Sequence, residues 1–477
     1  MTSRRTDDGT ISDRPRTFPP FLAAWRWWLP PALVALALAL IFLDPFAGDW
    51  DALDYTVLAL EGRPSSMLFG RTLFIFFNRL LWLAAHAVFS LPAEQSYLLF
   101  KYAVVVQSPL AVIACWALAR AVTGDERAAL VAALLVAVSP FYVIYSGQAM
   151  TEIPSLLCCA AALAVHAWGL RRNRAALVLC GAALLGASVN IREATGLYAP
   201  WLLVGPYLYG WRTARREIAV TLSAVVIFFA AALGPFAVLY LANIQNYQHD
   251  WHGWIASLRA ESAVHPISWV NFGPLLAYFF IAAPLAFVAL PVAAYREWRE
   301  RGLTPLLGLA AIGLAANLSL IMQYSVVING RYLLTGLPGI VPLVADYFVR
   351  AEVRRTKRTG VALSVVVAAI ALVTLVIGVA VYPMAAPTIA KHGYTKWYRA
   401  RLSALPQENA VVMAGTGTVS VTFWRGVGLG RWEVIGTGGG WPGDNLTGVI
   451  EDHLRAGRRV FLDADPRLWM GYGWQRA

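Results

Sequence analysis

The sequence predicts an α-helical protein that crosses a membrane many times and carries a small α/β domain near its C-terminal end. Of its 477 residues, 58% are hydrophobic and only 14% are charged, which is typical of an integral membrane protein. Long apolar segments recur as far as residue 383, whereas short strand-like and helix-like segments alternate after it. We therefore expect a transmembrane domain over residues 1–383 and a separate domain over residues 384–477.

Eleven apolar segments have about the length that a hydrocarbon core requires. They are residues 27–43, 98–119, 128–145, 152–170, 175–190, 194–210, 218–242, 270–294, 303–326, 330–349 and 360–383. The sequence therefore predicts about eleven transmembrane helices.

The basic residues predict the orientation of these segments. With a cytoplasmic N-terminal tail, the cytoplasmic tail and loops hold 21 Lys and Arg residues, and the opposite loops before residue 384 hold six. This asymmetry places residues 48–55 on the non-cytoplasmic side. The net charge of +12 therefore reflects topology and does not indicate a nucleic-acid partner. The four cysteines all lie in apolar segments, so we expect no disulfide framework.

The first outer loop, residues 44–97, is long and contains a second kind of apolar segment. Residues 70–90 are apolar, but Arg71, Asn78 and Arg79 interrupt them, and a crossing here would invert every later loop. We therefore expect this segment to form an amphipathic helix in the membrane interface.

The C-terminal segment has the alternation of a small α/β domain. We expect helices over residues 396–405 and 445–457 and strands over 410–415, 431–436 and 458–465. The run GTGTVS (415–420) lacks the rest of a dinucleotide fingerprint, so we expect it to be a structural turn.

Three carboxylates follow the first apolar segment in the run GDWDALDY (48–55): Asp49, Asp51 and Asp54. A carboxylate within the bilayer costs about 2.5–3.5 kcal/mol on insertion scales, whereas these lie just outside the lipid. Helix capping or simple solvation would explain any one of them. Their clustering indicates a polar site at the outer membrane surface.

Further polar residues lie at the outer ends of later segments. Glu152 begins one segment, Arg192 lies in a short outer loop, and Arg331 enters the tenth segment. The longer loop 243–269 is rich in Trp, His and Asn and carries His249 and His252, which suits a polar mouth.

Several short motifs resemble those of GT-C glycosyltransferases, such as protein O-mannosyltransferases and lipid A aminoarabinose transferases. Asp51 stands four residues before Tyr55, with Ala59 and Gly62 following in register. The usual acidic pair is missing because Ala52 follows Asp51. The runs SPFYVIYSGQAMTEIPSLL (139–157) and NGRYLLTGLPG (329–339) are similar to two later family motifs.

The resemblance implies a GT-C-like fold and transfer of a sugar from a polyprenyl-phosphate donor. The acceptor would be an extracytoplasmic glycan, lipid or protein, and the site would face outward from a bacterial inner membrane. In that chemistry Asp51 is the candidate general base, with Asp49 or Asp54 sharing or replacing it. Glu152 would orient the base or a metal.

The donor phosphate and a metal ion define the remaining candidate roles. Arg331 and Arg192 would hold the phosphate through paired hydrogen bonds, although either could instead extend toward the interface. Some members of the family bind a divalent ion through a histidine of this outer loop, so His249 and His252 are candidate ligands. A polar loop without a metal is the alternative.

A transporter or flippase of a lipid-linked sugar is the competing class of function. Transport predicts charged groups near the bilayer midplane, often within internal repeats. The sequence shows no obvious repeat, and its acidic and basic groups gather at one face. This distribution favours chemistry at the membrane surface.

Overall fold

A computed structural model of the chain describes residues 24–43, 50–64, 71–211, 214–264, 283–321, 330–353, 394–414, 418–436 and 446–463, together with residues 372 and 376. Asp49, the beginning of the eighth expected segment, almost all of the eleventh and the expected domain boundary at residue 383 lie outside these ranges.

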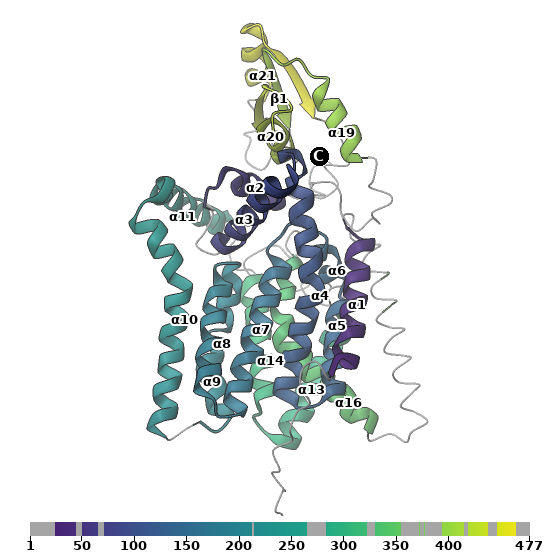
Figure 1. The fold of residues 1–477 in the computed structure, drawn as a ribbon, viewed down its shortest axis with the longest axis vertical. Coiled ribbons are helices and arrows are strands. Elements are labelled where there is room, and N and C mark those ends of the chain that lie inside the picture. The colour runs from purple at the N-terminus through teal and green to yellow at the C-terminus, as the bar shows by residue number, and fades with distance from the viewer. Residues whose placement is uncertain are drawn as a thin grey trace, which may run out of the picture.

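Long helices form a bundle, and a smaller domain lies at one end of it (Figure 1). The bundle helices are α1 (Trp25–Ile41), α4 (Ser96–Thr123), α5 (Glu126–Ala137), α6 (Pro140–Ser146), α7 (Glu152–Arg171), α8 (Ala175–Val189), α9 (Trp201–Leu208), α10 (Arg215–Leu241), α13 (Pro284–Arg301), α14 (Pro305–Ile321) and α16 (Leu337–Val353). Among the described residues, five helices are long and apolar enough to cross a membrane, or six if one bent pair counts as a single span. The chain is therefore a multi-pass helical membrane protein, as predicted.

Helix α4 packs against α7, and α7 packs against α8, so these three helices form the middle of the bundle. Small residues allow this close approach, as is common between helices in membranes. A Cβ atom on Gly181 of α8 would lie 2.6 Å from the backbone nitrogen of His166 on α7, so no larger residue fits there.

Three expected segments depart from straight α-helices. The third bends by 66° between α5 and α6, where Ser139 is extended because Pro140 follows it. The sixth divides into a 3₁₀ helix, η4 (Glu193–Tyr198), and α9, and the tenth opens with a 3₁₀ helix, η7 (Gly330–Gly336). Irregular backbone within a membrane protein is tolerated where it is buried in protein or lines a cavity, and these breaks border the site described below.

The first outer loop contains α2 (Trp50–Glu61) and α3 (Thr72–Phe89). The two helices pack together and lie at the end of the bundle, beneath the smaller domain (Figure 1). Helix α3 is long and apolar enough to span a membrane, yet its place at the end of the bundle agrees with the expected amphipathic helix. The loop expected over residues 243–269 instead contains the helix α11 (Tyr247–Val264).

Helix α2 ends at a motif glycine. Gly62 has φ +71°, a left-handed conformation that glycine adopts without strain. Arg79 of α3 donates hydrogen bonds to the carbonyl oxygens of Ala59, at 3.2 Å, and Leu60. These bonds satisfy carbonyl groups that the end of a helix leaves without partners.

The C-terminal domain has a three-stranded parallel sheet with the order β2-β1-β3. Its elements are α19 (Tyr394–Ser403), β1 (Ala410–Ala414), α20 (Thr418–Gly426), β2 (Glu433–Gly436), α21 (Leu446–Arg455) and β3 (Arg459–Asp463). The three expected strands and two expected helices are confirmed. The expectation of a turn over residues 415–420 was wrong from Thr418 onward, because parallel strands need a crossover and α20 supplies it.

Candidate active site

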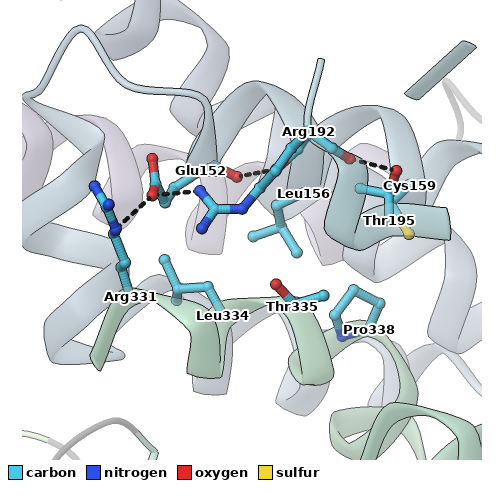
Figure 2. Close-up of a pocket in the computed structure, with 10 residues that line it drawn as sticks. Glu152, Leu156, Cys159, Arg192, Thr195, Arg331, Leu334, Thr335 and Pro338 are labelled. Atoms are coloured by element: carbon cyan, nitrogen blue, oxygen red, sulfur yellow. Dashed lines mark hydrogen bonds and ion pairs between the residues drawn. The ribbon is translucent and has the colours of Figure 1, made fainter. Parts of the chain in front are cut away.

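Four of the predicted site residues meet at the end of the bundle beneath the C-terminal domain. Asp51 comes from α2, Glu152 from the start of α7, Arg192 from the turn before η4, and Arg331 from η7. Arg331 Nη1 lies 2.7 Å from Asp51 Oδ2, and its Nε lies 3.5 Å from Glu152 Oε1. Arg192 donates a hydrogen bond to the same Glu152 oxygen (Figure 2). Asp51, Glu152, Arg192 and Arg331 therefore form a single ion-pair cluster, whereas Asp49 lies outside the described residues and, within them, no ion pair joins Asp54 to the cluster.

Glu152 is the centre of this cluster. It occupies the first turn of α7, where the partial positive charge of the helix N-terminus favours a carboxylate. Its side chain is only 1% exposed, and a carboxylate buried to this degree is tolerated only with charged partners. Its Oε1 is shared by two guanidinium groups, while its Oε2 is buried without a hydrogen-bond partner in the described part of the chain.

Arg192 is held on several sides. Its Nη1 also donates to Thr151 Oγ1 at 3.3 Å, and its guanidinium lies 4.9 Å from the ring centre of Tyr332. Burial opposes the charge of Arg192, but the surrounding acidic groups, Glu152 first among them, together outweigh this effect and raise the pKa of the guanidinium. Arg192 therefore remains a fixed positive charge.

Asp51 and Asp54 share helix α2 but differ in their electrostatic surroundings. Burial alone would raise the pKa of Asp51, but the charges of Arg331, Arg71 and Arg192 together hold it below its usual range. Burial, reinforced by the negative charge of Asp51, raises the pKa of Asp54 to about 6. At neutral pH Asp51 is thus an ionised ion-pair partner, whereas Asp54 has a pKa closer to that of an efficient proton acceptor.

Sequence reasoning missed the part that Arg71 plays. This arginine precedes α3, and its guanidinium lies 5.3 Å from the ring centre of Tyr55 and 3.7 Å from Glu193 Oε1. It therefore connects the motif tyrosine of α2 to the turn that carries Arg192. The sequence offered one signal for this role: Arg71 is a charged residue in the same outer loop as the motif around Asp51. We interpreted it only as an interruption of an apolar segment.

The two candidate metal ligands lie on α11, and both are exposed. His252 Nδ1 is 2.6 Å from the carbonyl oxygen of Gln248 on the same helix. Within the described ranges, no group of three or more His, Cys, Asp or Glu side chains could hold a metal ion. A metal ion at His249 and His252 therefore stays a prediction, and we derive no step through one.

A small pocket continues inward from the charged cluster between α7, η4 and η7 (Figure 2). It is lined by Glu152, Ser155, Leu156, Cys159, Arg192, Thr195, Arg331, Leu334, Thr335 and Pro338. Arg192 and Arg331 therefore pair with the carboxylates and also line this partly polar pocket.

Comparisons with known proteins support a GT-C-like fold, which the resemblance of the motifs implied. Residues 80–239 match the family described as dolichyl-phosphate-mannose-protein mannosyltransferase. Over 218 residues the chain is 30% identical to an undecaprenyl phosphate-alpha-4-amino-4-deoxy-L-arabinose arabinosyl transferase of Pseudomonas aeruginosa. That match covers 44% of this chain and 39% of the relative, so it spans less than half the length of either protein.

Solved structures extend the likeness in fold to most of the chain. The structure of ArnT from Cupriavidus metallidurans bound to undecaprenyl phosphate superposes with a TM-score of 0.58 at 14% identity, covering 92% of this chain and 90% of that one. The oligosaccharyltransferase AglB from Archaeoglobus fulgidus, in complex with an inhibitory peptide and a dolichol-phosphate, gives 0.55 at 14% identity, covering 86% of this chain and 64% of that one. The chain therefore has the fold that these proteins share.

Proposed function

We propose that this protein is an integral-membrane glycosyltransferase that moves a sugar from a polyprenyl-phosphate donor to an extracytoplasmic glycan, lipid or protein acceptor. The observation that carries this proposal is the buried cluster of Asp51, Arg331, Glu152 and Arg192 at one end of the bundle. The family match and the relatives named above, which act on or bind polyprenyl phosphates, support the same class of donor.

The cluster contains the two kinds of group that this reaction requires. The acceptor oxygen attacks the anomeric carbon, its proton passes to a carboxylate, and the bond from that carbon to the phosphate oxygen breaks with the electron pair going to phosphate. Arg331 and Arg192 would stabilise the negative charge on the departing phosphate. Both arginines line the pocket, so they can reach an anion there while Glu152 holds them.

Asp51 would act as the general base of this reaction. In the structure its carboxylate is paired with Arg331, which lowers its basicity. A donor phosphate that draws Arg331 toward the pocket would weaken this pair and raise the affinity of Asp51 for a proton. Such a change would link donor binding to activation of the acceptor. Asp54, with its pKa of about 6, is the alternative base on the same helix.

The finer topology belongs to the same proposal. We propose about eleven transmembrane helices in a bacterial inner membrane, with the charged cluster and the C-terminal domain on the extracytoplasmic side. The distribution of 21 against six basic residues between the loops supports this orientation. A divalent ion stays a prediction, and the dependence of transfer on added Mg²⁺ or Mn²⁺ after EDTA treatment tests it.

The geometry favours transfer over transport of a lipid-linked sugar. The cluster lies at the end of the bundle beneath the C-terminal domain, whereas transport sites typically lie near the bilayer midplane. A second charged group, formed by Glu297, Asp346 and Arg350, joins the C-terminal halves of α13 and α16. The expectation that acidic and basic groups gather at one face was therefore incomplete, because this second group lies away from the charged cluster of Asp51 and Glu152 in sequence and in its elements.

Mass analysis of envelope glycans and lipid-linked sugars, with and without the protein, tests the proposed activity. A transferase predicts that one glycan modification disappears while its polyprenyl-phosphate sugar accumulates. Purified protein should also bind undecaprenyl phosphate, and Arg331→Gln should weaken that binding while a matched surface change, Arg455→Gln, leaves it unchanged. Loss of the modification with the lipid-linked sugar trapped on the cytoplasmic leaflet would indicate transport instead, because a transferase defect leaves the donor on the outer leaflet.

A further inference from the structure

Helix α2, which carries Asp51 and Asp54, has two separate apolar faces. Successive residues of an α-helix are about 100° apart, so its residues fall on three stripes. Ala52, Tyr55 and Ala59 form one stripe, and all three are buried in the main core of the bundle. The two carboxylates lie outside this stripe.

The second apolar stripe of α2 packs against the C-terminal domain. Leu53 is buried, with Val57 and Leu60 beside it, in a cluster formed mainly by residues of that domain. Leu53 lies between the two carboxylates in sequence, but it packs in the cluster of the C-terminal domain, and α2 contacts α20. Helix α2 therefore packs on one side against the bundle and on another side against the C-terminal domain.

Aromatic side chains of α20 form the centre of this contact. Phe423 and Trp424 are 1% and 4% exposed, and their ring centres lie 5.7 Å and 6.3 Å from that of Tyr97, at the start of α4. Aromatic pairs in such edge-to-face arrangements are stabilising beyond the apolar area that they bury. An ion pair of 2.6 Å between Arg399 of α19 and Glu94 adds a second attachment near the start of α4.

We propose that the C-terminal domain positions helix α2 for the reaction, with Trp424 and Phe423 as its positioning residues. Without them, α2 would be held to the bundle by its other apolar stripe, by α3 and by the pair of Asp51 with Arg331. A rotation of α2 would move Asp51 from Arg331 and from the pocket. Small displacements of a reacting group cost up to about a hundredfold in rate.

Hydrogen exchange on the full-length protein tests the positioning directly. Trp424→Ala should speed exchange of the α2 amides (residues 50–61) about tenfold, and Trp424→Phe should restore most of the protection. Val411→Ala is the matched control, because Val411 is buried on the central strand of the same domain but is not part of the cluster that contains Leu53 and Trp424. It should speed exchange within β1 without changing α2.

Two outcomes would overturn the proposal. One is unchanged exchange in α2 when Trp424→Ala leaves β1 protected. The other is an equal increase of exchange in α2 caused by Val411→Ala. If Trp424→Ala unfolds the domain, Leu53→Ala probes the same contact from the other side and should speed exchange in α20 (residues 418–426). Unchanged exchange in α20 would then contradict the proposal.

The catalytic part of this inference rests on the proposed transferase function. In a transfer assay, Trp424→Ala should lower kcat about ten- to a hundredfold with little change in the KM for the donor, and Trp424→Phe should recover it. An equal loss of kcat in Val411→Ala would show a general structural effect. Absence of transfer in the unmodified protein would contradict the proposed function, whereas the exchange results would still decide whether the domain holds α2.

Discussion

At the scale of single residues, the site is a set of charges that compensate one another. Glu152 and Asp51 are matched by Arg192 and Arg331, so no charge in this group is buried without a counter-charge. Asp54 differs, because burial and the charge of Asp51 raise its pKa to about 6. The two aspartates of α2 should therefore titrate in different pH ranges, which allows their roles to be separated.

The acid limb of the pH profile of kcat/KM reports the pKa of the essential base in the free enzyme. A group with a lowered pKa keeps its carboxylate form to more acidic pH, whereas Asp54 is mostly ionised only above about pH 6. With Asp51 as the base, we expect the limb to lie well below pH 6 and to stay there in Asp54→Asn. A limb near pH 6 that vanishes in Asp54→Asn would assign the base to Asp54.

The residue identities of the site were more predictable than their partners. Asp51, Glu152, Arg192 and Arg331 could be selected because each lies at the outer end of an apolar segment, where charge is tolerated. The pairing of these residues with one another could not be predicted from the sequence, since it depends on the packing of α2, α7, η4 and η7. Arg71 was missed for the same reason, because its contact with Tyr55 crosses between two helices whose relative placement no local pattern specifies.

At the scale of elements, α2 is fixed at its C-terminal end by a glycine and an arginine. Gly62 has φ +71°, and a Cβ atom there would also lie 3.4 Å from the guanidinium of Arg79. A side chain at such a backbone conformation costs about 1–2 kcal/mol. The position of the glycine in the family-like motif is thus explained by the end of the helix.

We expect Gly62→Ala to lower the stability of the protein by about 1–2 kcal/mol, because the left-handed conformation then becomes strained. Thermal unfolding of the purified protein, monitored by circular dichroism, measures the change. Gly253→Ala is a suitable control, since Gly253 lies within α11 and a Cβ atom there meets no other atom within 4 Å. Equal stability of Gly62→Ala and the unmodified protein would contradict this account of the motif.

The long helices could be predicted from the length of the apolar segments, but the breaks within these segments could not. Long segments such as α4 and α10 were predicted closely, because a continuous apolar run of this length has few other stable conformations in a membrane. The bend before Pro140 and the 3₁₀ openings at η4 and η7 have only weak local signals. These breaks lie beside the site, where the backbone departs from regular helix to place Arg192 and Arg331.

At the scale of the whole molecule, the charged cluster and the C-terminal domain share one side of the membrane in the proposed topology. The contact between α2 and α20 requires that these two elements share a side. We propose from the distribution of loop charges that this side is extracytoplasmic. The small domain also illustrates a limit of sequence reasoning, because its strands were predictable whereas its docking on α2 was not.

Single cysteines in a background without the four native cysteines test this topology. We expect an impermeant maleimide to label Glu61→Cys and Ser403→Cys in intact cells, because both positions are exposed and lie on the proposed outer side. Arg174→Cys, between α7 and α8, should react only after the cells are opened. Labelling of Arg174→Cys in intact cells, with protection of the other two, would reverse the orientation.

The measurement that tests the central claim most directly is transfer from a polyprenyl-phosphate sugar by Asp51→Asn, with binding of undecaprenyl phosphate measured separately. The substitution keeps the shape of the side chain while removing its ability to take a proton. We predict a loss of about 10²–10⁴-fold in the rate of transfer, with undecaprenyl phosphate binding retained. Asp54→Asn, as the matched control on the same helix, should lose less. Near-normal transfer by Asp51→Asn would contradict the assignment of the base, and normal transfer by both variants would remove helix α2 from the chemistry.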